Sequence, residues 1–415
     1  MKIRLDKKAL MPLILFASLF INEDVLVFGT INNASLVNFR LAVQVCLAVF
    51  LLGYMMLNKV GIKKSRFRIF GIFAICYLAT MLINRDFRLG YVFMLLIYFI
   101  CLAMTTLYSF DDIYKFFCKM MFVICIVSLV GYLIQMLFPN VLNMFPVITN
   151  TVNNKFYFLG LTNVNFRTDA FIRNWGAFRE PGVYQLFIIV ALIYTLFRDR
   201  ESNWAKPLVF IVTILTTFST TGYIALGLII LAAILVDKKR LTKSQKRLLS
   251  VIVIATIALV LYLSFFTDLL FKSSGYGSVF GKLLGAYESV SFNARMASIW
   301  GNLQMFFENP IFGKGITFVD DNYAIIASNM YGMRVVDNTN MIFILLARFG
   351  IFIFVYFFYR LYKSIRDSYK LSHLSTSLIF ATYLVLMTGE NLSYSVIMVL
   401  PIFILSCDVN NNSNI

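Results

Sequence analysis

Long runs of apolar residues dominate this chain and restrict it to a fold that crosses a bilayer. About 20 apolar residues in a row make a helix long enough to span the hydrocarbon core. Hydrophobic residues make up 60% of the 415 residues and charged residues only 14%, which excludes an ordinary water-soluble globular protein. We predict twelve spans, at about residues 9–28, 37–57, 69–84, 89–108, 116–138, 182–198, 206–219, 221–236, 248–267, 341–359, 375–389 and 391–407. The sequence therefore predicts an all-α polytopic membrane protein, with residues 1–415 forming a single integral membrane domain.

The basic residues that give the formal net charge of +17 lie mainly in loops on one side of these spans. Lys and Arg recur in every second connection, at residues 2–8, 59–68, 115–119, 198–206, 238–247 and 360–370. Because short cytoplasmic loops carry an excess of Lys and Arg, we expect both termini in the cytoplasm. No basic run with interleaved aromatic residues is present, so the charge does not indicate a nucleic-acid partner.

Two connections are long, at about residues 139–181 and 268–340, and both fall on the external side of this topology. Long loops in compact proteins usually have a function. Both contain basic residues where the topology does not require them: Lys155, Arg167, Arg173 and Arg179 in the first, and Lys272, Lys282, Arg295, Lys314 and Arg334 in the second. We interpret Lys155, Lys272 and Lys282 as solvated surface charges. The others indicate an anionic substrate, and a lipid-linked phosphate is the anion expected at the outer membrane surface.

The segment from Arg173 to Gln185, RNWGAFREPGVYQ, places two arginines and a glutamate at the entrance of a span. Pro181 is typical of the first residue of a helix. Glu180 directly precedes Pro181, and the sequence supports two interpretations of it equally well. It is either a base that accepts a proton or an acidic residue that complements the dipole of the following helix.

The second long loop contains a predicted amphipathic helix. Apolar residues recur at helical spacing over 296–307, and Arg295, Ser298 and Asn302 share the opposite face. This pattern predicts a helix that lies in the membrane interface with its apolar side down and ends before Pro310. It is either a plain surface helix or a lid that presents Arg295 to an anionic headgroup.

Residue types that bind metals give no site in this sequence. The six cysteines lie within predicted spans or near their inner ends and form no CxxC motif, so we expect neither disulfides nor a metal site. The single histidine, His373, falls on a predicted cytoplasmic loop. We interpret the acidic pair Asp320-Asp321 as loop surface, and we expect no cofactor.

Four short patterns lie near the external ends of the predicted spans. They are Arg173-x-x-Gly176-x-Phe178-x-Glu180-Pro181, then Arg295 with Trp300 leading to Asn309-Pro310-x-Phe312-Gly313-x-Gly315, then Asp337-Asn338-Thr339-Asn340 leading through Leu345 to Gly350, and the weaker turn Ser219-Thr220-Thr221-Gly222. With the span count and loop placement, they resemble bacterial O-antigen and capsule polymerases of the Wzy type, which share a superfamily with the O-antigen ligases. The resemblance extends over most of the chain.

This resemblance implies a GT-C-like membrane glycosyltransferase in the bacterial plasma (inner) membrane. Such a polymerase joins undecaprenyl-diphosphate-linked repeat units into O-antigen or capsular polysaccharide, as part of lipopolysaccharide or capsule biosynthesis. Its partners would be undecaprenyl-diphosphate-linked glycans and membrane lipids, together with a chain-length regulator and a flippase of the same pathway.

The resemblance also implies which residues form the site. Displacing a diphosphate develops negative charge on the leaving group, and arginines can stabilise that charge. The catalytic residues would be Glu180, Arg173, Arg179 and Arg295, and the substrate-binding residues Arg334, Asp337, Asn340 and Arg348. Glu180 is the favoured base, while Asp337 and Glu390 are weaker candidates.

Three other functions remain open at this point. Similar O-antigen ligases carry a His-Asn pair where this chain has Thr339-Asn340, so a ligase with an imidazole base is disfavoured. A flippase for the same lipid-linked sugar would also suit twelve spans. However, the predicted spans hold almost no acidic residue other than Glu390 to couple an ion gradient, and the two halves show no repeat. A structural scaffold would leave the external arginines unexplained.

The predicted topology can be tested with reporters. Tags at both termini should report cytoplasm, while reporters inserted near Asn153 and Gly275 should report the outside. An inward report from either loop insertion would contradict the placement of the candidate site.

Overall fold

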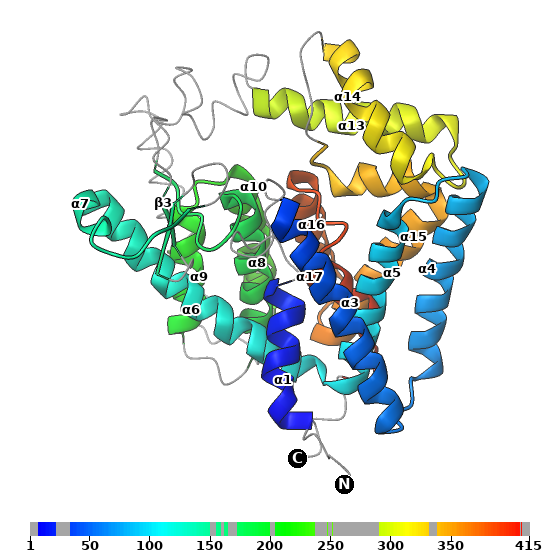
Figure 1. The fold of residues 1–415 in the computed structure, drawn as a ribbon. Coiled ribbons are helices and arrows are strands. Elements are labelled where there is room, and N and C mark those ends of the chain that lie inside the picture. The colour runs from blue at the N-terminus through cyan, green and yellow to red at the C-terminus, as the bar shows by residue number, and fades with distance from the viewer. Residues whose placement is uncertain are drawn as a thin grey trace.

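The protein folds as a helical bundle with two helices lying across one end (Figure 1). The computed structural model describes residues 7–21, 34–149, 155–158, 162–164, 172–199, 204–236, 247, 251, 290–331, 338–406 and 408. The predicted substrate-binding residues Arg334 and Asp337 lie outside these ranges, as does most of the predicted span 248–267.

Nearly all of the described elements are helices. They are α1 (Lys7–Phe16), the π-helical turn η1 (Ala17–Ile21), α3 (Ala34–Leu57), α4 (Lys64–Ile83), α5 (Leu89–Leu107), α6 (Phe110–Leu137), α7 (Pro139–Leu142), α8 (Pro181–Phe197), α9 (Ala205–Thr216), α10 (Thr220–Leu235), α13 (Val290–Glu308), α14 (Gly315–Tyr331), α15 (Met341–Tyr369), α16 (His373–Gly389), α17 (Val396–Val399) and the 3-10 turn η3 (Leu400–Phe403). One small antiparallel sheet follows α7, in the order β1 (Ile148–Thr149), β2 (Lys155–Tyr157) and β3 (Thr162–Val164). Thr149 pairs with Lys155, and Tyr157 pairs with Thr162.

The helices agree with most of the predicted spans and indicate an integral membrane protein. By length and composition, α4, α5, α6 and α15 are long and apolar enough to cross a membrane. Shorter apolar helices cover Ala9–Ile21, Leu41–Leu57, Pro181–Phe197, Ala205–Thr216, Thr220–Leu235 and His373–Gly389. Each lies where a span was predicted.

The twelfth predicted span, 391–407, is not a continuous helix. It contains only the four-residue turns α17 and η3, and Pro401 stands inside the second, where it cannot donate a backbone hydrogen bond. The whole of both turns is buried among other helices. Broken backbone at membrane depth is tolerated when protein groups bind it. Here Arg360 donates to the carbonyl of Ile402 at 3.1 and 2.9 Å, and Arg66 donates to a further carbonyl at 3.4 Å.

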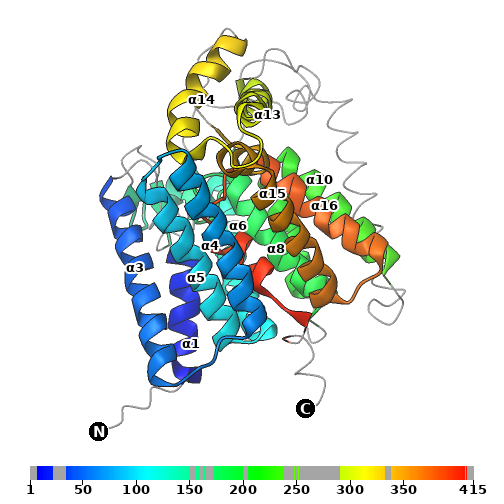
Figure 2. The same ribbon diagram turned by 90° about the vertical axis from the view of Figure 1, so that its right-hand side faces the viewer.

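The central helix of the bundle is α8. Its residues from Val183 to Phe197 are all buried, which fits a helix that is apolar on every side. Figure 2 shows α3, α4 and α5 side by side on one flank and α10 running along α16 on another. In Figure 1, α13 and α14 lie across one end of the bundle, whereas α1 begins and α3 ends at the opposite end. We call the end that carries α13 and α14 the capped end.

The turn between α13 and α14 is packed against a break in α15. Gly350 has φ 75 inside α15, so the helical hydrogen bonds are interrupted there. The turn supplies replacements, because Lys314 N donates to the Ala347 carbonyl at 2.8 Å and Ile351 N donates to the Pro310 carbonyl at 2.9 Å. This break and turn hold the start of α14 against the bundle.

Replacing Gly350 with alanine should destabilise the protein. Position 350 needs a positive φ, and a Cβ there would overlap the Ile311 carbonyl. We expect a loss of more than about 1 kcal/mol in the free energy of unfolding, measured by thermal unfolding in detergent. Gly71→Ala is the control, because a Cβ at that position in α4 meets nothing within 4 Å. Equal stability of the two variants would contradict the role of the break.

Candidate active site

The segment before α8 is built to hold its charged residues at the capped end. Asn174 is buried, donates from its side chain to Thr216 Oγ1 at 3.0 Å, and accepts from Gly176 N at 3.0 Å. Gly176 has φ 52, and a Cβ there would come within 2.6 Å of the Tyr184 ring. The conformation therefore requires glycine. It lets the chain turn tightly over α8, with Phe178 stacked on Tyr184 at 5.2 Å.

Arg179 joins two carboxylates that are far apart in the sequence. Its Nη2 atom lies 3.0 Å from Glu180 Oε1 and 3.0 Å from Glu390 Oε2. Glu390 follows the last residue of α16, and its side chain is only 9% exposed, whereas the Glu180 side chain is 42% exposed. Glu180 is the residue before α8, yet its side chain makes no capping hydrogen bond to the helix. Its carboxylate is therefore accessible beside a cation.

Arg173 is held near the same charges by the backbone of a neighbouring turn. Its Nε donates to the Thr217 carbonyl at 2.9 Å, in the turn between α9 and α10. Burial lowers the pKa of Arg173, the negative charges of Glu180 and Glu390 raise it, and the charge of Arg295 lowers it. Arg173 therefore lies within electrostatic reach of Glu180, Glu390 and Arg295.

Arg295 reaches this cluster from α13. Its side chain is exposed, and its charge lowers the pKa of Glu390 as well as that of Arg173. Two nearby guanidinium groups repel each other, and a bound anion would relieve that repulsion. The structure therefore brings together all four residues expected to be catalytic, and adds Glu390 to them.

The orientation of α13 differs from the prediction. The helix ends at Glu308, before Pro310 as predicted, but Ser298 and Asn302 on its polar face are completely buried. Trp300 and Phe307 are 49% and 72% exposed. The predicted polar face therefore packs against protein at Ser298 and Asn302 instead of facing water, while Arg295 on the same face is exposed.

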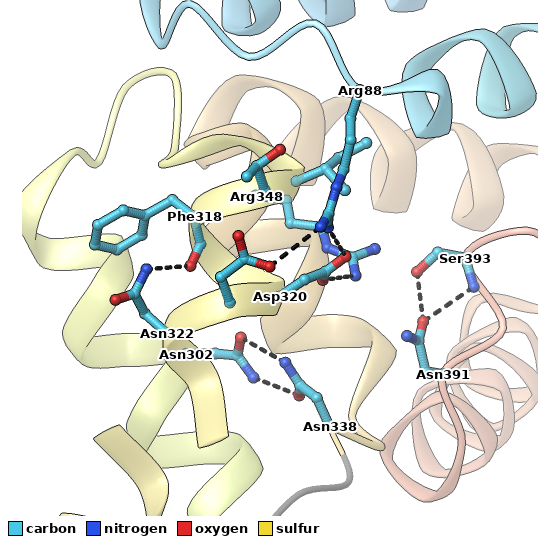
Figure 3. A network of polar contacts seen from close by, with 12 residues as sticks. Arg88, Asn302, Phe318, Asp320, Asn322, Asn338, Arg348, Asn391 and Ser393 are labelled. Carbon is cyan, nitrogen blue, oxygen red and sulfur yellow. Dashed lines mark hydrogen bonds and ion pairs between the residues drawn. The ribbon is translucent and has the colours of Figure 1, made fainter. Parts of the chain in front are cut away.

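Amide partners in the chain before α15 explain why the polar face turns inward. Asn338 Oδ1 accepts from Ser298 Oγ at 2.7 Å and from Asn302 Nδ2 at 2.8 Å, and Asn302 Oδ1 accepts in return from Asn338 Nδ2 at 3.2 Å (Figure 3). Asn340 N donates to Ser298 Oγ at 3.0 Å. Asn340 is fully buried and caps α15. This predicted substrate-binding residue therefore has a structural position in the protein core.

Arg348, the other described residue expected to bind substrate, is 5% exposed and paired within the protein. It forms an ion pair with Asp320 of α14, and Arg88 lies 3.1 Å from both Asp320 and Asp321 (Figure 3). The acidic pair expected on loop surface is thus part of a helix and holds it to α5 and α15. This network could not be predicted from the sequence, because Arg88 directly precedes the predicted span 89–108 and is 232 positions from Asp320.

Asp86 anchors the start of α14 beside this network. It accepts from Thr317 N at 2.9 Å, from Thr317 Oγ1 at 2.5 Å and from the Tyr91 hydroxyl at 3.1 Å. Burial raises the pKa of Asp86, but these hydrogen bonds outweigh it and lower the pKa below its usual value. An anion at a helix N-terminus is stabilising. Asp86 and Arg348 therefore hold α14 against the start of α5 and against α15.

Potential metal ligands do not cluster in the part of the chain that the structure describes. No group of three or more His, Cys, Asp or Glu side chains is found there. The charged cluster is composed of three arginines and two glutamates. Its chemistry is that of anion binding and proton transfer.

Comparison with known proteins supports the superfamily that the motifs predicted. Residues 208–361 match the family described as O-antigen ligase. This region runs from α9 to α15 and includes Arg295 and Gly350. It indicates a ligase-like or polymerase-like function in polysaccharide biosynthesis, and it does not separate the two. No curated protein matches the chain.

Removing Arg179 should destabilise the protein in a pH-dependent way. Arg179→Ala would leave the buried Glu390 without its cation, at a cost of about 1–3 kcal/mol. Burial and the charge of Glu180 raise the pKa of Glu390, so the folded state holds a proton more tightly than the unfolded state. The stability deficit should therefore be small at acidic pH and grow as pH rises above the usual glutamate pKa.

Thermal unfolding between about pH 5 and pH 8 checks this prediction. The exposed Arg85, in the connection between α4 and α5, is the matched control for loss of a positive charge. Adding Glu390→Gln to Arg179→Ala should restore part of the stability at high pH. A deficit that does not change with pH would show that the ion pair is not its cause.

Proposed function

We propose that this protein is a polysaccharide polymerase that joins undecaprenyl-diphosphate-linked repeat units at the outer face of the bacterial plasma membrane. The observation that carries the proposal is the meeting of Arg173, Arg179, Arg295, Glu180 and Glu390 at the capped end. A reaction at the outer face requires a topology with the capped end outside and both termini in the cytoplasm. Residues 139–181 and 268–340 are then the external segments.

The three arginines divide into two roles in this proposal. Arg179 is engaged with Glu180 and Glu390, so its charge serves to hold the carboxylates. Arg173 and Arg295 have no carboxylate within ion-pair distance among the described residues, which leaves them the better ligands for a diphosphate. Guanidinium groups suit this task because they give two parallel hydrogen bonds to phosphate oxygens.

The proposed reaction uses these groups in one displacement. A hydroxyl of the acceptor repeat unit attacks the anomeric carbon of the donor chain, and the bond from that carbon to the diphosphate breaks. Arg173 and Arg295 stabilise the negative charge that develops on the leaving diphosphate. Glu180, which is 42% exposed beside Arg179, accepts the hydroxyl proton.

Two of the four residues predicted to bind substrate, Asn340 and Arg348, have a different proposed role. Asn340 and Arg348 hold α13, α14 and α15 together, and so they keep Arg295 over the cluster. Arg334 and Asp337 follow α14 in sequence, and we propose that they contact the glycan. This leaves direct diphosphate binding to the arginines of the cluster.

The position of the single histidine favours a polymerase over a histidine-dependent ligase. His373 is the first residue of α16, and Glu390 follows the last, so about 25 Å of helix separates them. No imidazole can therefore act as base at the cluster. A ligase that uses a carboxylate base remains the second candidate, because the matched family is described as O-antigen ligase.

The glycans of a strain that lacks the protein distinguish these functions. Loss of a polymerase should leave single repeat units attached to the lipopolysaccharide core or carrier. Loss of a ligase should leave full-length polymer on the lipid diphosphate carrier, and loss of a flippase should leave no repeat unit on the outer surface. Either of the last two results would contradict the proposal.

Substituting the cluster arginines should abolish or severely reduce the polymer. Arg173→Ala and Arg295→Ala each remove a charge-assisted contact to the leaving group, which is typically worth a factor of about 100 or more in rate. Arg→Lys should not restore full activity, because an ammonium lacks the planar fork. The measurement is the ladder of polysaccharide bands, with Arg85→Ala as control. Full ladders at normal protein levels from both cluster variants would refute the site.

The reaction should also need no added divalent cation. The proposed leaving-group stabilisation comes from guanidinium groups, so polymerisation by the purified protein should continue in EDTA. The reaction without chelator is the control. Loss of activity in EDTA, with recovery on adding Mg²⁺ or Mn²⁺, would contradict the arginine-only account.

A further inference from the structure

Two carboxyl groups share a single nitrogen atom of Arg179. Glu180 Oε1 and Glu390 Oε2 each lie 3.0 Å from Nη2, so one positive charge faces two negative ones. The Glu390 carboxyl occupies the space that a side chain at position 182 would need, because a Cβ built there would lie only 2.5 Å from Glu390 Oε1. Glycine at this position is what lets the buried carboxyl approach the start of α8 so closely.

We propose that Glu180 and Glu390 act as one proton-accepting pair, in which exposed Glu180 meets the acceptor hydroxyl and buried Glu390 shares the proton. This inference rests on the polymerase reaction proposed above and adds a second carboxyl group to it. Glu390 is a positioning residue in this scheme, since it acts through Glu180. Arg179 holds both carboxylates in place.

The proton balance of the reaction defines the working state of the pair. The form of the pair that acts as base is the one in which both carboxylates are ionised. The acceptor oxygen forms its bond to the anomeric carbon, the electron pair of the broken bond leaves with the diphosphate, and the hydroxyl proton moves to the pair. The pair then holds one proton between two oxygens and returns it to water. A second nearby negative charge strengthens the base, because it favours proton uptake.

The groups that face Glu390 determine how tightly the pair holds this proton. Burial raises the pKa of Glu390 well above its usual value, and the charge of Glu180 raises it further. The charges of Arg179 and Arg295 lower the pKa of Glu390, and the charge of Glu390 in turn raises the pKa of Arg173. Along α10, which packs against α16, the only titratable side chain is Tyr223.

Infrared titration of the full-length protein in nanodiscs tests the pair without any substrate. The protonated-carboxyl band that disappears in Glu390→Gln belongs to Glu390. In Glu180→Gln this band should titrate at lower pH than in the wild type, by about one unit or more, because the repelling charge is gone. In Arg179→Gln it should titrate at higher pH. A band that titrates at the same pH in Glu180→Gln and wild type would overturn the pair.

The pH dependence of polymerisation gives a second readout, using lipid-linked repeat units extracted from the strain that lacks the protein. The ascending limb of kcat/KM should move to lower pH in Glu390→Gln, and the plateau should fall by about tenfold or more. Glu390→Asp keeps the charge, so the ascending limb of its kcat/KM profile should lie at the same pH as in the wild type.

The outcomes separate this inference from the proposed function. An equal loss at every pH in Glu390→Gln would mean that Glu390 only supports the fold, and would refute the pair. If the wild type makes no polymer, the polymerase proposal fails, while the infrared titration still decides whether the two carboxyl groups share a proton.

Discussion

The ion cluster at the start of α8 is the interaction on which the rest of this structure depends. An apolar bundle has few places where charges can be held, since each buried charge needs a partner. Here Arg179 meets Glu180 and Glu390 at 3.0 Å each, at the N-terminus of a helix whose own residues are almost entirely buried. Because α8 fills the centre of the bundle, this cluster has a fixed position at the capped end.

The helices of the capped end are arranged to bring a third arginine to this cluster. The glycine break in α15 receives the turn between α13 and α14, while the Ser298 hydroxyl and the side-chain amides of Asn302 and Asn338 join α13 to the start of α15. These contacts carry no chemistry of their own. They determine where Arg295 lies, and so they connect packing in the matched O-antigen ligase region to the charges before α8.

Several parts of this arrangement could be predicted from the sequence, for reasons of length and local geometry. Apolar runs gave the positions of most helices, Pro181 gave the start of α8, and Pro310 gave the end of α13. The arginines and Glu180 were found because they stand where a membrane topology does not require charge. All of these signals are local in the sequence.

The features that the sequence did not predict depend on contacts between distant segments. Arg179 and Glu390 are 211 positions apart, and helical periodicity cannot say that they pair. Periodicity correctly grouped Ser298 with Asn302, but it could not show that this face meets Asn338 instead of water. Composition likewise cannot distinguish a membrane-spanning helix from the buried, broken segment that contains Pro401.

Diphosphate binding is the most direct test of the central claim that this cluster receives a lipid-linked diphosphate. Binding of undecaprenyl diphosphate to the purified protein in nanodiscs can be compared for the wild type, Arg173→Ala and Arg85→Ala. We expect Arg173→Ala to raise the Kd by about tenfold or more, which corresponds to about 1.4 kcal/mol, and Arg85→Ala to leave it unchanged. The same Kd for all three proteins would contradict the account.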